Sequence, residues 1–382
     1  MEKKIINILK NFLKNKNKSL HSPIFFGNEK KYLLNCIKTT YVSSVGQYVK
    51  KFEDNISKYT KVKNTVALIN GSSALFLLLK ALGIGKKDEV LIPSLTFIAT
   101  ANAVFHAGAD PNFVDVGENS FCICPNKLEN YLLRSCYIFR GKTFNKKTNK
   151  QIKAIILVYL FGFAEQVEKI KRICKKFNLI LLEDAAEAIG SYYKKKHLGT
   201  FGDAGVISFN GNKTITCGNG AVVITKNKKL AKKVRHLSVN AKINHPYEYI
   251  HNDYGYNFRL SNINAAIGCA QLENITTIIK LKRKNFAEYK KKFSLFKKIS
   301  IVSEPKNCIS NYWLINLDLN KFHKIKNRLL KKLNFNSIKA RALWKPLHQL
   351  KIFNYCSRDN LKNTEQLYSR VISLPSSPSL FK

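Results

Sequence analysis

The chain has 382 residues, of which 66 are Lys or Arg and 24 are Asp or Glu, giving a formal net charge of +42. A hydrophobic share of 45% and an aromatic share of 11% are typical of a globular protein with a sizeable core and exclude a disordered chain. No apolar run approaches the roughly 20 residues that a membrane span needs, and the first residues lack a signal-peptide cleavage site, so we expect a cytosolic protein.

The excess of basic residues allows two interpretations. A positive field attracts phosphates and is typical of nucleic-acid-binding proteins. The lysines are, however, spread through all segments, and no zinc-finger or RNA-binding signature accompanies them. We therefore favour a coding bias towards Lys, Asn and Ile and expect no nucleic-acid partner. A basic protein that binds nucleic acid or membrane surfaces is a distant alternative.

The cysteine pattern also excludes a class of protein. There are nine cysteines and no Cys-x-x-Cys pair. This pattern indicates reduced, mostly buried thiols and predicts neither a disulfide framework nor a metal site.

Residues 1–40 are predicted to form an N-terminal helical extension. The first 18 residues place Ile5, Leu9, Phe12 and Leu13 at helical spacing, with lysines between them. This amphipathic pattern favours a helix that packs on the protein or at a dimer edge. A membrane-surface helix is the alternative.

Residues 41–270 alternate between helical and strand-like segments. The pattern predicts helices at 49–59, 74–82, 97–106 and 164–177. It predicts strands at 65–69, 89–93, 112–116, 153–160, 179–183, 205–209 and 221–225. Such alternation is typical of α/β proteins, in which a mostly parallel sheet has helices on both faces. Residues 139–151 interrupt the alternation and are predicted to form a surface hairpin.

Residues 271–382 are predicted to form a smaller C-terminal α+β domain. A long charged helix is expected at 276–293 and a basic helix near 321–333. Short strands are expected at 300–302 and 311–317.

Polar residues follow the predicted strands at their carboxyl ends, where ligands bind in parallel α/β sheets. Ser72 follows the first strand, Asp184 follows the strand at 179–183, and Ser208 lies five residues before Lys213. Lys213 is in a turn rich in Gly, Asn and Thr, where a partly desolvated amine could attack a carbonyl. With the aromatic Phe97, these residues make up the inventory of a pyridoxal phosphate site.

Each of these residues also has a plainer interpretation. Lys213 could be a solvated turn lysine, and Asp184 could cap a helix. The Gly71-Ser72 turn could be an ordinary helix N-terminus, and Phe97 could lie in the core.

Five motifs decide between these interpretations. They are Asn70-Gly-Ser-Ser-Ala-Leu75, Pro93-Ser-Leu-Thr-Phe-Ile-Ala-Thr100, Glu183-Asp-Ala-Ala-Glu-Ala-Ile-Gly190, Ser208-Phe-Asn-Gly-Asn-Lys213 and Gly255-Tyr-Asn-Phe-Arg-Leu260. In this order, and over nearly the whole chain, they resemble the DegT/StrS-type sugar aminotransferases, which are fold type I pyridoxal phosphate enzymes. The resemblance implies an α/β fold with a mostly parallel, seven-stranded-type sheet, helices on both faces, and a smaller C-terminal α+β domain.

Within that family, two further segments indicate a branch. In combination with Ser208-Phe-Asn-Gly-Asn-Lys213, the segments Val42-Ser-Ser-Val-Gly46 and Gly190-Ser-Tyr-Tyr-Lys194 most resemble the branch that acts in legionaminic acid and bacillosamine synthesis. That branch aminates C4 of a nucleotide-linked 4-keto-6-deoxy sugar.

The resemblance implies a role for each matching residue. Lys213 would hold the cofactor covalently and then move a proton between the amino donor and the cofactor. Asp184 would pair with the protonated pyridine nitrogen. Gly71, Ser72 and Ser208 would bind the phosphate.

Other positions complete the implied site. Phe97 would stack on the ring, and Asn257 would reach the phosphate of the neighbouring subunit, which implies an obligatory homodimer with shared active sites. Glu187 departs from the Gln or His that the family often has near the ring oxygen. A carboxylate there is unfavourable unless one of the two groups is protonated. The candidate substrate residues are Ser43, His251, Tyr256 and Arg341, the last for the donor carboxylate or the pyrophosphate.

The implied activity is transfer of an amino group from glutamate to C4 of a UDP- or GDP-linked 4-keto-6-deoxy sugar. Amination at C3 is the alternative within the family. Family dehydratases have a His in place of the lysine, so Lys213 argues against that activity.

Overall fold

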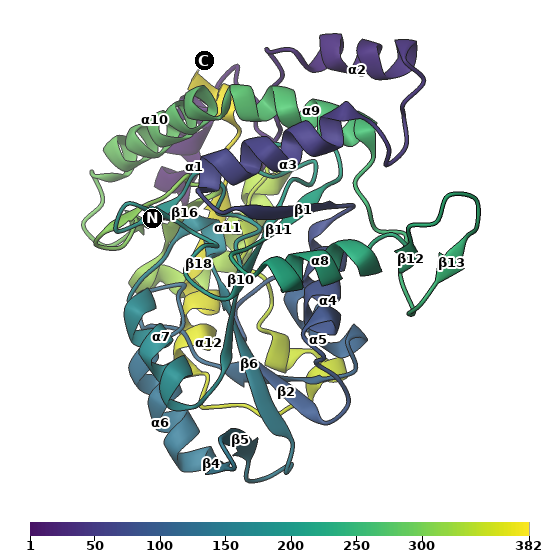
Figure 1. Cartoon of the computed structure of the whole chain (residues 1–382). Helices are drawn as coiled ribbons and strands as arrows, with labels where there is room; N and C mark the ends of the chain where they lie inside the picture. The colour runs from purple at the N-terminus through teal and green to yellow at the C-terminus, as the bar shows by residue number, and fades with distance from the viewer. Residues whose placement is uncertain (382) are drawn as a thin grey trace.

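A nine-stranded sheet forms the centre of the molecule in the computed structural model, which describes residues 1–381 (Figure 1). Seven strands follow the order β1 (Asn64–Leu68), β11 (Ala221–Thr225), β10 (Ala204–Ser208), β7 (Ile180–Asp184), β6 (Gln151–Val158), β2 (Asp88–Pro93) and β3 (Asp110–Val114). The neighbours from β10 to β3 are parallel, whereas β11 is antiparallel to both β1 and β10. The prediction of a mostly parallel sheet is therefore confirmed.

The predicted surface hairpin differs in position and role. The strands β4 (Cys136–Phe139) and β5 (Lys142–Asn145) form the hairpin, which starts before residue 139. Strand β5 also pairs with β6 at Gln151 and Ile152, which lie before the residues of β6 that pair with β7. The hairpin is thus an extension of the sheet.

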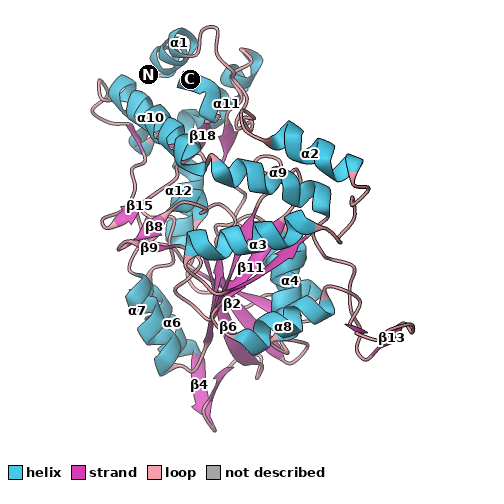
Figure 2. Ribbon diagram, turned by 45° about the horizontal axis from the view of Figure 1, so that its top comes forward, coloured by secondary structure: helices cyan, strands magenta, loops and turns pink. Residues whose placement is uncertain are grey.

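Helices cover both faces of the sheet (Figures 1 and 2). Successive strand residues point to opposite faces, so Val206 lies in one apolar cluster and Ile207 in the other. The first cluster includes residues from α4 (Gly71–Ala81), α5 (Ala99–His106) and α8 (Lys228–Leu237). The second includes residues from α3 (Gln47–Thr60), α6 (Pro125–Ser135), α7 (Val167–Lys176) and α9 (Asn262–Glu273).

The C-terminal part has its own sheet and core. Its strands follow the order β14 (Ser300–Ile301), β16 (Ile315–Asp318), β18 (Val371–Leu374) and β17 (Arg341–Ala342). Its helices are α10 (Ile275–Phe293), α11 (Lys326–Phe335) and α12 (Lys362–Arg370), with 3-10 turns at Asn320–Ile325, Leu347–Gln349, Lys351–Phe353 and Pro378–Phe381. The proposed domain limits at residues 40 and 270 stay a prediction.

The predicted strand at 311–317 begins only at Ile315. Before it, Tyr312 adopts a left-handed backbone with φ of 47°. The buried Asn311 side chain donates to the carbonyl oxygens of Glu187 and Ile189 at 2.8 and 2.9 Å. These contacts hold residues 311–314 against the large sheet's loops, so they cannot join a ladder.

The N-terminal helix α1 (Glu2–Phe12) packs on this C-terminal part. Ile5 and Leu9 are fully buried in a cluster with Tyr289 of α10 and Leu329 of α11. Glu2 forms ion pairs with Arg328 and Lys332 of α11. The apolar stripe of α1 is therefore covered by protein, as the packing interpretation predicts.

Three smaller elements lie at the periphery. Helix α2 (Glu29–Lys38) lies against α9, and a three-stranded sheet joins β15 (Cys308–Ile309), β8 (Tyr192–Tyr193) and β9 (Lys196–His197). The strands β12 (Lys242–Ile243) and β13 (Ile250–His251) form an arm that projects from the body (Figure 2). Within residues 1–381, no helix has both the length and the apolar character needed to cross a bilayer.

Candidate active site

A cavity of about 740 Å³ opens at the carboxyl ends of the parallel strands, where this architecture places its ligands. Asp184 ends β7 and Ser208 ends β10, while Trp344 and Arg341 close the cavity from the C-terminal part. The sequence-predicted residues that line it are Gly71, Ser72, Phe97, Asp184, Glu187, Ser208, Lys213 and Arg341.

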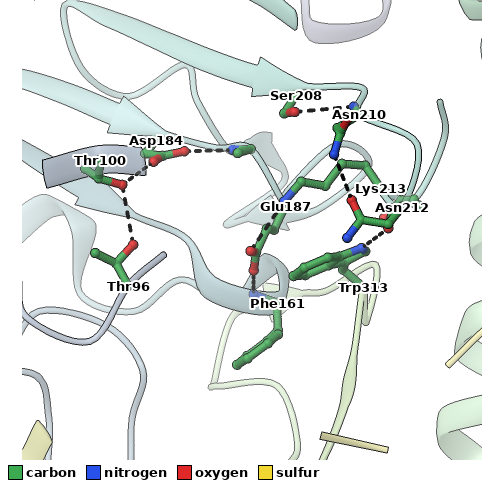
Figure 3. A network of polar contacts seen from close by, with 12 residues as sticks. Thr96, Thr100, Phe161, Asp184, Glu187, Ser208, Asn210, Asn212, Lys213 and Trp313 are labelled. Carbon is green, nitrogen blue, oxygen red and sulfur yellow. Dashed lines mark hydrogen bonds and ion pairs between the residues drawn. The ribbon is translucent and has the colours of Figure 1, made fainter. Parts of the chain in front are cut away.

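Lys213 lies between a carboxylate and an aromatic ring (Figure 3). Its Nζ is 3.4 Å from Glu187 Oε1 and 4.1 Å from the centre of the Trp313 ring. Trp313 is held in place because its Nε1 donates to the Asn212 carbonyl oxygen at 2.7 Å. Only 13% of the Lys213 side chain is exposed, so the interpretation as a solvated turn lysine is wrong.

Asp184 is a buried carboxylate held by uncharged donors. Its Oδ2 accepts from Thr100 Oγ1 at 2.7 Å, and its Oδ1 accepts from the Ala186 backbone N–H at 3.1 Å (Figure 3). Burial raises the pKa of Asp184, while these hydrogen bonds and Lys213 act in the opposite direction. A cationic group in the cavity would supply the counter-charge that the carboxylate lacks.

Glu187 faces Lys213 with one oxygen and the backbone with the other. Its Oε2 accepts from the Phe161 N–H at 2.8 Å. Phe161 presents that N–H from a left-handed backbone with φ of 58°, an uncommon conformation for an aromatic residue. Burial raises the pKa of Glu187 to about 7, against the opposing effect of Lys213. Both charge states are therefore populated near neutral pH.

The start of α4 and the end of β10 form a cradle of small residues. The Asn70 side chain caps the helix by accepting from the Ser73 N–H at 2.8 Å. A Cβ on Gly71 would lie 3.3 Å from the Ser208 Cβ, which is a tight contact, so glycine at position 71 favours the close approach of the two elements. Backbone N–H groups at a helix N-terminus beside a serine hydroxyl suit a phosphate.

These residues fit the pyridoxal phosphate that the resemblance implies. The cradle would hold the phosphate, Asp184 would face the pyridine nitrogen, and Lys213 would reach the aldehyde carbon. A charged Glu187 carboxylate would be unfavourable beside the ring oxygen of the cofactor. With a pKa of about 7, this carboxyl group can be protonated there instead. Phe97, which is half-exposed, packs edge-to-face on Trp344, and its stacking on the cofactor stays a prediction.

Four predicted site residues lie outside this cavity. His251 is on the projecting arm, and Asn257 pairs with Val239 near its base. Tyr256 packs edge-to-face on Phe76 at 5.0 Å. The remaining residue, Ser43, uses its carbonyl oxygen to accept from the N–H of Asn262. Their roles in a site stay predictions.

The sequence interpretation missed several cavity residues. Phe161, Trp313 and Trp344 form a set of nearly parallel rings with centres 5.6–6.3 Å apart. His21, from the segment before α2, also lines the cavity. The sequence signal that could have indicated two of these residues is the rarity of tryptophan, because Trp313 and Trp344 are the only two tryptophans of the chain.

Comparison with known proteins assigns most of the chain to one family. Residues 26–382 match the model of the DegT/DnrJ/EryC1/StrS aminotransferase family. The GDP-perosamine synthase of Escherichia coli O157:H7 is 36% identical over 364 residues, covering 94% of this chain and 93% of its own length. The UDP-4-amino-4,6-dideoxy-N-acetyl-beta-L-altrosamine transaminase of Campylobacter jejuni is 30% identical and covers 86% of this chain and 85% of its own length.

A solved structure agrees with the fold. Helicobacter pylori PseC, an aminotransferase involved in the biosynthesis of pseudoaminic acid, is similar with a TM-score of 0.85 and 25% identity. The match covers 94% of this chain and 93% of that chain.

Proposed function

Because this chain belongs to the DegT/DnrJ/EryC1/StrS aminotransferase family, we propose that it transfers an amino group from glutamate to C4 of a nucleotide-linked 4-keto-6-deoxy sugar. It is a nucleotide-sugar transaminase that uses pyridoxal phosphate. The observation that carries the proposal is the position of Lys213, which lies in the cavity with Glu187, Trp313 and the buried Asp184 around it.

The names of the relatives support amination at C4 and a nucleotide as the carrier of the sugar. The C. jejuni relative is named for a 4-amino-4,6-dideoxy sugar on UDP, and the E. coli relative for a GDP sugar. The second is the more similar to this chain, at 36% against 30% identity. We therefore propose a GDP-linked substrate first and a UDP-linked one second.

The residues of the chain have separate tasks in this reaction. Pyridoxal phosphate, when bound, supplies the electron sink for the Cα of the donor. Lys213, which lines the cavity, removes the proton at that Cα with its Nζ. Asp184 holds the proton on the pyridine nitrogen, and the start of α4 with Ser208 binds the phosphate. Arg341, on the opposite wall, binds the anionic group of either substrate.

We propose that two copies complete the site. A second cavity of about 540 Å³ shares Ser72, Ser73 and Phe97 with the first. The projecting arm carries highly exposed tyrosines, namely Tyr247, Tyr249 and Tyr254. Exposed apolar side chains also gather on and after α2, namely Leu34, Ile37, Tyr41, Val42 and Val45. Exposed apolar side chains of this kind are typical of interaction sites, so we propose that the arm of a second copy binds in the second cavity.

Bound cofactor gives a direct test of the proposal. The purified protein should absorb visible light after addition of pyridoxal phosphate, and glutamate should remove the band. Lys213→Ala should not form the band, and Lys213→Arg, which keeps the charge beside Trp313, should not form it either. A wild-type protein that stays colourless would contradict the proposal.

The substrate is tested with a panel of GDP- and UDP-linked 4-keto-6-deoxy sugars. The glutamate-treated protein should regain its visible band with the correct sugar. The nuclear magnetic resonance spectrum of the product should show nitrogen on C4. Nitrogen on C3 would support the alternative activity instead.

A further inference from the structure

A histidine that the proposed chemistry does not use lines the cavity beside Lys213. His21 lies in the segment between α1 and α2, and its ring centre is 6.5 Å from that of Trp313. Both ring nitrogens are buried, and neither has a hydrogen-bond partner among the residues that the structure describes. Buried polar atoms in native proteins are nearly always paired, so these two nitrogens are available to a hydrogen-bonding group that enters the cavity.

The backbone on both sides of His21 is fixed. The Leu20 carbonyl oxygen accepts from the Ser376 N–H at 2.8 Å, and the Ser22 N–H donates to Ser377 Oγ at 2.9 Å. These bonds attach the segment to the residues that follow strand β18. The imidazole is therefore preorganised at the cavity wall, and little conformational entropy is lost when a ligand binds it.

The surroundings of His21 determine its charge. Burial, together with the charges of Lys282 and Lys213, lowers its pKa well below the ordinary value. Lys282 is itself fully buried, and its Nζ donates to the carbonyl oxygens of Trp313 and Ser376 at 2.9 and 2.6 Å. The imidazole is thus neutral at physiological pH, with one nitrogen as a donor and the other as an acceptor.

The chemistry of a neutral imidazole selects one kind of ligand group. Carboxylates and phosphates only accept hydrogen bonds, so each could satisfy only the donor nitrogen. A hydroxyl group can donate to one imidazole nitrogen or accept from the other, and a sugar carries several hydroxyls. Glutamate carries no hydroxyl, and its only hydrogen-bond donor is the amino group that reacts with the cofactor. The two substrates proposed above therefore differ in the group that His21 can recognise.

We propose that the imidazole of His21 binds a hydroxyl group of the sugar in the nucleotide-sugar substrate and so contributes to recognition of that substrate but not of the amino donor. This inference rests on the proposed function and names a specificity residue within it. Because His21 contacts only the sugar, it should affect neither the binding of the free nucleotide nor the reaction with glutamate.

Tryptophan fluorescence provides a readout independent of turnover. Both tryptophans of the chain line the cavity, so the intrinsic signal reports on this site alone. The probes are GDP and a GDP-linked 4-keto-6-deoxy sugar, together with their UDP counterparts, titrated into the pyridoxal phosphate holoenzyme without glutamate, so that no amino group is available for transfer. The variants are His21→Phe, which keeps an aromatic ring without hydrogen bonds, and His21→Asn, which keeps a donor and an acceptor. His323→Phe, at an exposed histidine, is the control.

His21→Phe should weaken binding of the keto sugar nucleotide by about tenfold to a hundredfold, the effect of losing a buried hydrogen bond. His21→Asn should recover part of that loss. Binding of the free nucleotide and the rate at which glutamate removes the visible band should stay within about twofold of the wild type. His323→Phe should match the wild type in every measurement.

Three results would overturn the inference. Equal weakening of nucleotide and sugar nucleotide would mean that His21 only shapes the cavity, and a slower glutamate step would mean that it binds the donor. Unchanged sugar binding by His21→Phe would also refute it while leaving the proposed function intact. A wild-type protein that binds and aminates no sugar in the panel would refute the proposed function itself.

Discussion

Two buried carboxylates, Asp184 and Glu187, face the same cavity, and their partners differ. Asp184 accepts only from uncharged donors, Thr100 and the Ala186 N–H. Glu187 accepts from the Phe161 N–H and also faces the Lys213 ammonium. The surroundings of Asp184 suit a carboxylate that pairs with a cationic ring when the cofactor binds. Those of Glu187 suit a group that changes its protonation near neutral pH.

Asp184→Asn should separate cofactor binding from catalysis. The amide keeps the shape but removes the negative charge that faces the ring nitrogen, and a charge-assisted hydrogen bond of this kind corresponds to about tenfold to a hundredfold in rate. Turnover should fall by that factor while the visible band of the bound cofactor remains. Thr100→Val, which removes only one hydrogen bond to Asp184, should lower the rate less. A larger effect from Thr100→Val would contradict this assignment.

Glu187→Gln should change how stability depends on pH. The pKa of Glu187 is raised from 4.5 to about 7 in the folded chain, so between these values the folded state binds more protons than the unfolded state. The wild type therefore loses stability through this group as pH rises from about 4.5 to 7. Glutamine does not titrate, so the variant without cofactor should gain about 2 kcal/mol relative to the wild type between pH 5 and pH 8.

Urea unfolding at the two pH values measures this difference. Glu118→Gln, at an exposed glutamate, serves as the control and should show no pH-dependent gain. If Glu187→Gln changed the free energy of unfolding equally at both pH values, the pKa of the Glu187 carboxyl group would not be raised in the folded chain.

Much of the site was predictable at the residue scale. Strand periodicity alone brings Asp184 and Ser208 to one edge of a parallel sheet, and Lys213 follows in the next turn. Trp313 and His21 were not predictable in this way. They reach the cavity from segments far away in the sequence, and their positions depend on long-range contacts such as those of Asn311 and Ser376.

At the scale of elements, the sequence predicted the large sheet well and the irregular segments poorly. Fully buried strands appear as continuous apolar runs, which is why β6, β7, β10 and β11 were found close to their observed limits. The β4–β5 hairpin was placed too late, because its first strand follows α6 without a polar break at Cys136. Residues 311–314 look like a strand, but side-chain hydrogen bonds override that preference.

The packing of α1 gives a prediction at this scale. Leu9 is fully buried against the C-terminal part, so Leu9→Ala should lower the free energy of unfolding by about 2–5 kcal/mol. Thermal unfolding monitored by circular dichroism measures the change. Leu295→Ala, at a leucine that is 81% exposed, should change it by less than about 0.5 kcal/mol. Equal effects of the two variants would favour a surface role for α1.

At the scale of the whole molecule, shared sites have a measurable signature. If Asn257 acts on the phosphate of the neighbouring subunit, Lys213→Ala and Asn257→Asp damage different halves of each site. Each variant alone should be inactive, the second because its carboxylate repels the phosphate. Random remixing of the two in equal amounts should restore about a quarter of the wild-type activity, because half of the dimers contain one intact site.

Activity recovered on remixing therefore tests both the dimer and the role of Asn257. Remixing Lys213→Ala with Asp184→Asn is the control, because both residues line one cavity of the same chain. If the sites are shared only through Asn257, that mixture should gain nothing, since every site retains one of the two defects. Recovery in the control would place these residues on different subunits.

The contact between α1 and α11 also determines when this part of the chain can fold during synthesis. Helix α1 leaves the ribosome before α11, and Leu329 and Leu333, which complete its apolar cluster, follow about 300 residues later. At roughly 5–20 residues per second, the apolar stripe waits on the order of 15–60 s for its partners. The segment carrying His21 is attached to Ser376 and Ser377, which lie far later in the sequence. This part of the cavity wall can therefore be completed only after those two serines have been synthesised.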